Sequence, residues 1–190
     1  MAKVILDPMI ASISGRVGDQ IFKRVGNRTI VTRRPDMSHV VFSEAQLAYQ
    51  ERFRRAIAYL KMVRANPDLR APYERAATLT DKTVHQLAVA DFMRAPVIDK
   101  FELKYYAGRV SDPIVIDAHD DFEVAEVRLR IAGLDDVEIE QGPAVANRSE
   151  SGRWVYIARA AVAPGTRIFA TVTVSDHAGN RTEALIAKTV

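Results

Sequence analysis

The pair Gly26-Asn27 constrains the N-terminal part of this chain more than any other feature. It separates two short apolar stretches, residues 20–25 and 29–32, and it tolerates the positive φ that a two-residue hairpin turn requires. Pro35 marks the end of the second stretch because it cannot donate to a sheet ladder. The pattern therefore predicts a β-hairpin within residues 14–35.

The register set by this turn leaves apolar side chains on both faces of the hairpin. It pairs Lys23 with Ile30 and Phe22 with Val31, so neither face has the polar character of a half-solvated ribbon. A two-stranded ribbon alone is at best marginally stable in water. We therefore expect the hairpin to dock, either on its own domain or on a neighbouring copy of the protein.

The hairpin residues that would make this contact are of two kinds, apolar anchors and arginines that would meet an acidic surface. The hairpin could pair with a sheet edge of the next copy or occupy a helical groove on it. Such a contact repeats into a ring or an open filament. The anchors are Ile21, Phe22, Ile30 and Val31, and the arginines are Arg24, Arg28, Arg33 and Arg34.

Charge is distributed unevenly along the chain. The net charge of +3 combines +7 over residues 1–64, zero over 65–107 and −4 over 108–190. A basic front and an acidic back favour head-to-tail contact between copies, since opposite charges steer encounter and fix orientation. Two alternatives stay open: a basic surface for nucleic acid, and two solvated surfaces that merely differ in sign.

Residues 43–96 have helical periodicity and predict a helical module. Ser43 and Gln46 have the spacing of a capping box, and Asn66-Pro67 would end the first helix. Shorter helices are expected over residues 68–77 and from a cap at Thr80 or Asp81 to about residue 94. The stripe of the first helix that we expect to be buried consists of Tyr49, Phe53, Ala56, Ile57, Leu60 and Val63.

From Val97 onward the apolar residues recur with a period of two. About seven short strands in some ninety residues, separated by turn-prone sequence, are typical of an antiparallel β-sandwich of Greek-key type. Trp154, the only tryptophan, is expected in its core. The predicted strands include residues 114–116, 127–131, 137–139, 154–158, 168–174 and 184–187.

Three short motifs carry a resemblance in this part of the chain. They are G-x-W-x-Y at residues 152–156, P-G-T at 164–166 and D-x-A-G-N at 176–180. In this order they resemble the second half of bacterial and phage immunoglobulin-like domains. The resemblance is good over residues 137–189 and loose over residues 99–134. It implies a domain of a kind that usually binds, spaces or decorates and seldom catalyses.

The front of the chain carries a second resemblance. The sequence SGRVGDQIFKRVGNRTIVTRRP, followed by a helix that begins AQLAYQERF, is similar to a group of bacterial and prophage proteins with an N-terminal S-G-[K/R]-V-G hairpin motif. In that group a hairpin, R-x-x-P and a glutamine-rich helix follow the motif. The resemblance implies a phage or surface structural protein.

No pattern of catalytic, cofactor-binding or metal-binding residues is found in the sequence. The four histidines are far apart and lack ligand spacing, and the absence of cysteine excludes disulfides and thiolate catalysis. Gly15 and Gly18 do not form a dinucleotide or phosphate-loop fingerprint. We therefore predict no enzyme activity, no cofactor and no metal, and leave open calcium binding by the acidic cluster Asp112, Asp117, Asp120 and Asp121.

These observations predict an α+β protein in three parts: a β-hairpin arm at residues 1–42, a helical module at 43–96 and an immunoglobulin-like antiparallel β-sandwich at 97–190. The predicted function is that of a non-enzymatic structural protein, the subunit of an extracellular filament or phage-type particle. It would form a homo-oligomer or polymer through its arm. The alternative is a nucleic-acid-associated protein that uses the basic N-terminal half. A third hypothesis, a carbohydrate- or receptor-binding module, rests on analogy with the sandwich fold alone. We expect synthesis in the cytoplasm without a cleavable signal peptide, and no membrane span.

Overall fold

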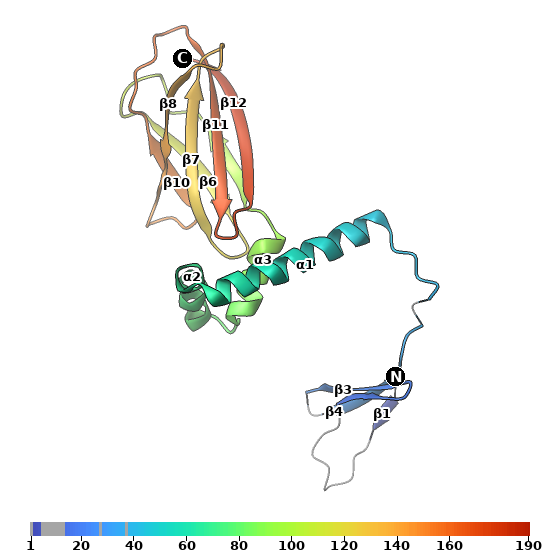
Figure 1. Cartoon of the computed structure of the whole chain (residues 1–190). Helices are drawn as coiled ribbons and strands as arrows, with labels where there is room; N and C mark the ends of the chain where they lie inside the picture. The colour runs from blue at the N-terminus through green and yellow to red at the C-terminus, as the bar shows by residue number, and fades with distance from the viewer. Residues whose placement is uncertain (1, 5–13, 27, 37) are drawn as a thin grey trace. The chain divides into compact units, whose positions relative to one another are not determined.

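The computed structural model describes residues 2–4, 14–26, 28–36 and 38–190. Over these residues the chain forms three α-helices and three antiparallel four-stranded sheets, so the fold is mixed α+β with a β-rich C-terminal part (Figure 1). The chain divides into two compact units, residues 1–46 and 47–190.

The N-terminal unit contains one sheet with the strand order β1-β4-β3-β2. Its hairpin has the predicted register, with Phe22 opposite Val31 and Lys23 opposite Ile30; Asn27 of the predicted turn lies outside the described residues. The hairpin is not a lone ribbon, however, because β1 pairs with β4 and β2 pairs with β3. The strands are β1 (Ala2–Val4), β2 (Gly15–Val17), β3 (Gln20–Val25) and β4 (Arg28–Arg33).

Helix α1 (Glu44–Ala65) begins at the predicted capping box. The Ser43 N–H donates to Oε1 of Gln46 at 2.9 Å, and the Gln46 N–H donates to Oγ of Ser43 at 3.3 Å. The described helices lack the combination of length and apolar character that a membrane crossing requires.

The stripe predicted along α1 is buried only in its second half. Ala56, Leu60 and Val63 are buried, whereas Tyr49 is 64% exposed and Phe53 is 44% exposed. The prediction was wrong for these two aromatic residues because α1 is longer than the body on which it packs. The hydrophobic core of the helices takes side chains from α1 only between Tyr59 and Val63.

Helices α2 (Pro67–Leu79) and α3 (Val84–Met93) complete the helical part. The Asn66 side chain caps α2 by accepting the N–H of Asp68, which agrees with the predicted break at this position. The cap of α3 is Thr83 rather than Thr80 or Asp81. Thr83 and Gln86 bond reciprocally, at 2.8 and 3.2 Å, and so form a second capping box.

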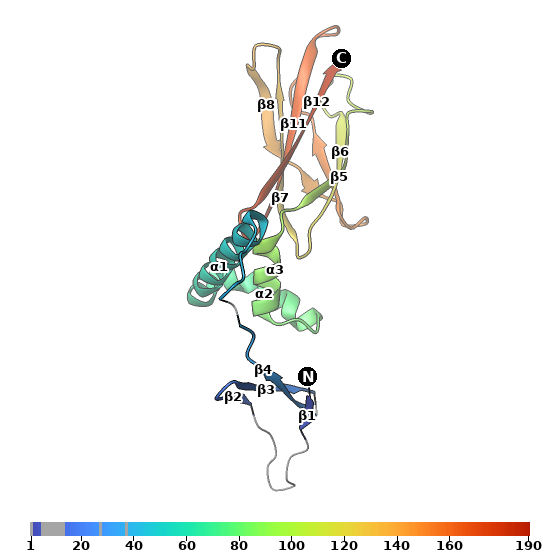
Figure 2. The same ribbon diagram turned by 90° about the vertical axis from the view of Figure 1, so that its right-hand side faces the viewer.

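Residues 97–190, the β-domain, form two four-stranded sheets with the orders β5-β6-β10-β9 and β12-β11-β7-β8. The sheets lie as separate layers (Figures 1 and 2) and share one core, to which Ile116 and Tyr156 contribute from one sheet and Leu129 and Val172 from the other. Trp154 is partly buried and packs against this core. The strands are β5 (Val97–Glu102), β6 (Pro113–His119), β7 (Val124–Ala132), β8 (Glu138–Pro143), β9 (Val145–Ala146), β10 (Arg153–Ile157), β11 (Arg167–Asp176) and β12 (Arg181–Thr189).

Two glycines of the β-domain provide a matched test of its packing. Gly108 (φ +80°) and Gly165 (φ +84°) both have positive φ, but only at Gly108 would a Cβ meet a neighbour, the carbonyl oxygen of Val162 at 2.9 Å. We expect Gly165→Ala to cost about 1–2 kcal/mol from backbone strain alone, and Gly108→Ala to cost clearly more. Urea unfolding of both variants measures the difference, and equal midpoints would contradict this account of the contact.

Candidate functional site

The N-terminal sheet is the first candidate site because the apolar side chains with assigned exposure in it are at most half-buried. Among its described residues with assigned exposure, Thr29 alone is buried. Phe22 and Val31 are half-buried, and Val17 and Val25 are exposed. Among the residues with assigned exposure, the hydrophobic side chains of this unit thus form no buried core cluster.

The register places seven of the eight predicted hairpin residues on one of the two faces of this sheet. Because side chains alternate along a strand, Phe22 and Val31 share a face with Arg24 and Arg33, while Ile21 and Ile30 share the opposite face with Arg28. Arg34 directly follows β4, and its N–H donates to the carbonyl oxygen of Asp19 at 2.8 Å. Each face therefore combines apolar and basic groups.

The end of the sheet is hollowed beside two of the predicted arginines. A cavity of about 630 Å³ is lined by residues of the β2–β3 turn, the end of β4 and the segment after it. Asp36 accepts the N–H of Ser38 at 2.9 Å, and this hydrogen bond lowers the pKa of the Asp36 carboxyl. The lining residues are Asp19, Arg33, Arg34, Pro35, Asp36 and Ser38.

The second candidate site is a polar cluster where the helices meet the β-domain, here called the junction. Its first part is a chain of hydroxyl groups from α1 and α2. The Tyr59 hydroxyl lies 2.9 Å from the Tyr73 hydroxyl and 3.1 Å from the carbonyl oxygen of His177. Tyr73, fully buried, makes a further hydrogen bond with Oδ2 of Asp91 on α3 and stacks on Phe122 with ring centres 4.7 Å apart.

Asn180, in the turn between β11 and β12, joins the end of α3 to the β-domain. Its side-chain amide donates to the carbonyl oxygens of Asp91 at 3.0 Å and Arg94 at 3.1 Å, and to Oδ2 of Asp176 at 2.7 Å. The last carbonyls of a helix have no partner within the helix, so this amide supplies one from another element. The D-x-A-G-N motif therefore has a packing role beyond its turn.

Three carboxyl groups meet at the junction, from Asp91, Asp120 and Asp176. Burial raises the pKa of Asp91 to about 7, against the opposing effect of the hydrogen bond with Tyr73. The carboxyl of Asp176 adds to the rise, and that of Asp120 does so through its charge and a hydrogen bond. Burial also raises the pKa of Asp176. Oδ1 of Asp91 and Oδ1 of Asp120 are both buried and receive no hydrogen bond from a donor group. Sequence reasoning missed this cluster because its members lie far apart along the chain.

The acidic residues considered for calcium binding each have their own hydrogen-bond or ion-pair partners. Asp112 accepts the N–H groups of Ala107 and Arg109, Asp117 pairs with Arg153 at 2.8 Å, and Asp121 pairs with Arg94 at 2.5 Å. In the described part of the chain, no three His, Cys, Asp or Glu side chains are arranged to hold a metal ion.

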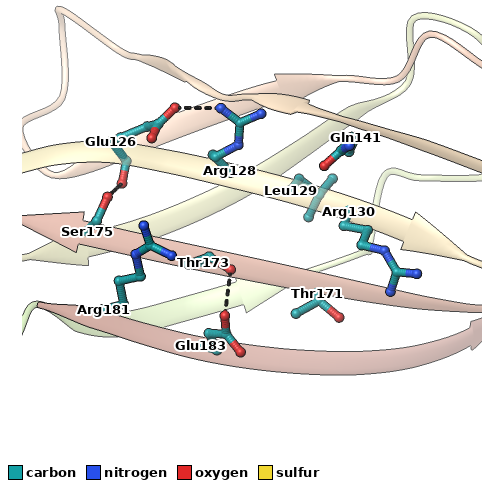
Figure 3. A pocket seen from close by; sticks show the side chains of 10 residues that line it. All are labelled: Glu126, Arg128, Leu129, Arg130, Gln141, Thr171, Thr173, Ser175, Arg181 and Glu183. Carbon is teal, nitrogen blue, oxygen red and sulfur yellow. Dashed lines mark hydrogen bonds and ion pairs between the residues drawn. The ribbon is translucent and has the colours of Figure 1, made fainter. Parts of the chain in front are cut away.

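The outer face of the sheet β12-β11-β7-β8 contains a second hollow, of about 570 Å³ (Figure 3). Most of the charged side chains that line it form ion pairs or hydrogen bonds with neighbouring side chains. Arg128 pairs with Glu126 at 2.9 Å, and the Thr173 hydroxyl donates to Glu183 at 3.1 Å. None of the residues predicted from the sequence for a site lies there. We therefore regard this face as a self-paired polar surface.

Comparison with known proteins finds a likeness of structure but none of sequence. No protein-family model matches the chain, and no curated protein matches it. Two solved structures are similar in part. CopC from Methylosinus trichosporium OB3b is 14% identical in sequence, with a TM-score of 0.39. The matched region covers 50% of this chain and 92% of the CopC chain. The Br derivative of BhCBM56 is 11% identical in sequence, with a TM-score of 0.31. The matched region covers 44% of this chain and 85% of the BhCBM56 chain.

Proposed function

We propose that this chain is a non-enzymatic structural protein that assembles with copies of itself through its N-terminal sheet, as the subunit of an extracellular filament or phage-type particle. The observation that carries the proposal is the four-stranded sheet with one buried side chain among its residues of assigned exposure. A sheet gains independent stability by covering a hydrophobic face. A second copy of the chain would provide that cover.

Charge favours a second copy as the partner. The sheet belongs to the basic part of the chain, with +7 over residues 1–64, and residues 108–190 carry −4. The acidic surface of one copy would thus complement the arginines of the next. Because β1 and β2 already occupy the outer edges of the hairpin, the contact would use the faces of the sheet rather than a long free edge.

The β-domain would act as the spacing or display module of the subunit, with an immunoglobulin-like fold. Supporting this, its sheet orders β5-β6-β10-β9 and β12-β11-β7-β8 correspond to the strand orders A-B-E-D and G-F-C-C′ of immunoglobulin-type sandwiches. The motifs at residues 152–156 and 176–180 occupy β10 and the β11–β12 turn of this arrangement.

The test replaces two apolar residues on one face of the sheet. In the double variant Phe22→Asp and Val31→Asp, we expect assemblies to fall to the mass of one chain, 21.2 kDa, because two carboxylates would have to be desolvated in the contact. Light scattering after gel filtration measures the mass. Leu79→Asp, at a residue of α2 that is 85% exposed and lies in the part of the chain with zero net charge, is the matched control and should leave assembly unchanged.

Two results would overturn the proposal. One is a double variant that assembles like the wild type. The other is a wild-type protein that is monomeric and binds duplex DNA with an affinity that falls about 10³-fold or more between roughly 50 and 200 mM salt, as phosphate contacts require. The second result would favour the nucleic-acid alternative.

A further inference from the structure

A row of polar groups at the junction has more hydrogen-bond contacts than its hydroxyl hydrogens can fill. Four groups lie in a row: the carbonyl oxygen of His177, the hydroxyls of Tyr59 and Tyr73, and Oδ2 of Asp91. They make three oxygen-to-oxygen hydrogen-bond contacts. The carbonyl can only accept, and each tyrosine hydroxyl supplies one hydrogen. With Asp91 ionised, two hydrogens must serve three contacts, and one contact is left without a proton.

A proton on Asp91 completes the row. The carboxyl then donates to Tyr73, Tyr73 donates to Tyr59, and Tyr59 donates to the carbonyl of His177. Each of the three contacts then has its own hydrogen. Without that proton the two tyrosine oxygens face each other at 2.9 Å with no hydrogen between them, an unfavourable contact that favours the neutral carboxyl.

The surroundings of Asp91 favour the neutral form for a second reason. Asp91 is fully buried, and its Oδ1 receives no hydrogen bond from a donor group. Its side chain lies within hydrogen-bond reach of the Asp120 carboxyl, a contact that favours a proton on Asp91. The loop before β7 contributes the carboxyl of Asp120 and the end of β11 that of Asp176, both of which disfavour a further negative charge at Asp91. The basic groups near the junction have other partners: Arg94 pairs with Asp121, and His177 lies 3.4 Å from Glu123.

We propose that Asp91 carries a proton in the folded protein and donates it to Tyr73, and that this proton closes a pH-sensitive latch between the helices and the β-domain. With the proton bound, the row from Asp91 to His177 ties α1, α2 and α3 to the turn after β11. Loss of the proton leaves a buried carboxylate beside Asp120 and Asp176, and the latch loosens.

The direction of the pH dependence follows from the raised pKa of Asp91, about 7 in the folded protein against an ordinary value of 3.8. A raised pKa means that the folded state binds the proton more tightly than the unfolded state. The stabilising effect of the proton is therefore complete below about pH 4 and is lost as the pH rises toward 7. Above pH 7 the latch is loose.

The experiment follows the carboxyl carbon of Asp91 by NMR during a pH titration of the full-length protein. We expect an apparent pKa far above that of an exposed aspartate. Tyr59→Phe is the decisive variant. It frees the hydrogen of Tyr73 to donate to Asp91, so the pKa of Asp91 should fall. An Asp91 that titrates near pH 4 in the wild type, or whose pKa is unchanged in Tyr59→Phe, would overturn the proposal.

Hydrogen exchange of the α3 amides, corrected for the intrinsic effect of pH, tests the latch itself. We expect at least about tenfold less protection at pH 8 than at pH 5 in the wild type. Asp91→Asn should abolish this difference, because an amide donates to Tyr73 at every pH. Asp81→Asn, at an exposed residue, should retain it. If millimolar Ca²⁺ restored the hydrogen-exchange protection of α3 at pH 8, the junction would be a cation site. That result would overturn the assignment of a proton to Asp91.

Discussion

Removal of residues 1–35 is expected to leave a folded protein that no longer assembles. Both hydrophobic cores of the larger unit consist of residues from Tyr59 onward, and the truncated chain retains Ser43, the cap of α1. The thermal midpoint of residues 36–190 should therefore stay within a few degrees of that of the full-length protein. The mass by light scattering should fall to that of a single chain. The contrast between the two measurements separates loss of assembly from loss of folding.

A truncated protein that still assembles would place the contact elsewhere in residues 36–190. The exposed aromatic residues Tyr49 and Phe53 on the first half of α1 would then be the next surface to test. Tyr49→Ser with Phe53→Ser in the truncated chain addresses this directly. Assembly lost only in this combined variant would assign the contact to α1 and contradict the proposed role of the N-terminal sheet.

Local signals predicted the local structure well. The pair Gly26-Asn27 and the apolar stretches beside it determined the register of β3 and β4, because a two-residue turn leaves one way to align the strands. Ser43 and Gln46 likewise determined the start of α1. The predicted burial of Tyr49 failed for a different reason. Periodicity shows which side of a helix is apolar, but not how far the partner elements extend along it.

The junction could not be predicted because it depends on residues far apart in the sequence. Asp91 and Asn180 are separated by 89 positions and meet only once the helices and the β-domain are placed together. A buried aspartate in an apolar stretch such as residues 87–92 would have been a usable signal, since buried carboxyls usually have partners. It would have indicated a partner for Asp91 without identifying Tyr73.

Asn180→Ala is expected to weaken the attachment of the helices to the β-domain. The variant removes the donor to the carbonyls of Asp91 and Arg94, and it leaves the buried carboxyl of Asp176 without its 2.7 Å side-chain partner. Each buried acceptor left unpaired costs about 1–3 kcal/mol. We therefore expect a loss of at least about 2 kcal/mol in the free energy of unfolding, with the largest loss of hydrogen-exchange protection in α3.

Asn147→Ala provides the matched control for this variant. The Asn147 side chain accepts the N–H of Ser149 at 3.0 Å, a contact within its own turn. Its removal should cost less than about 1 kcal/mol, as for an exposed local hydrogen bond, and should leave α3 protected. If both asparagine variants lose the same stability, Asn180 acts only within its turn. If only Asn180→Ala lowers the hydrogen-exchange protection of α3, the Asn180 amide joins the helices to the β-domain.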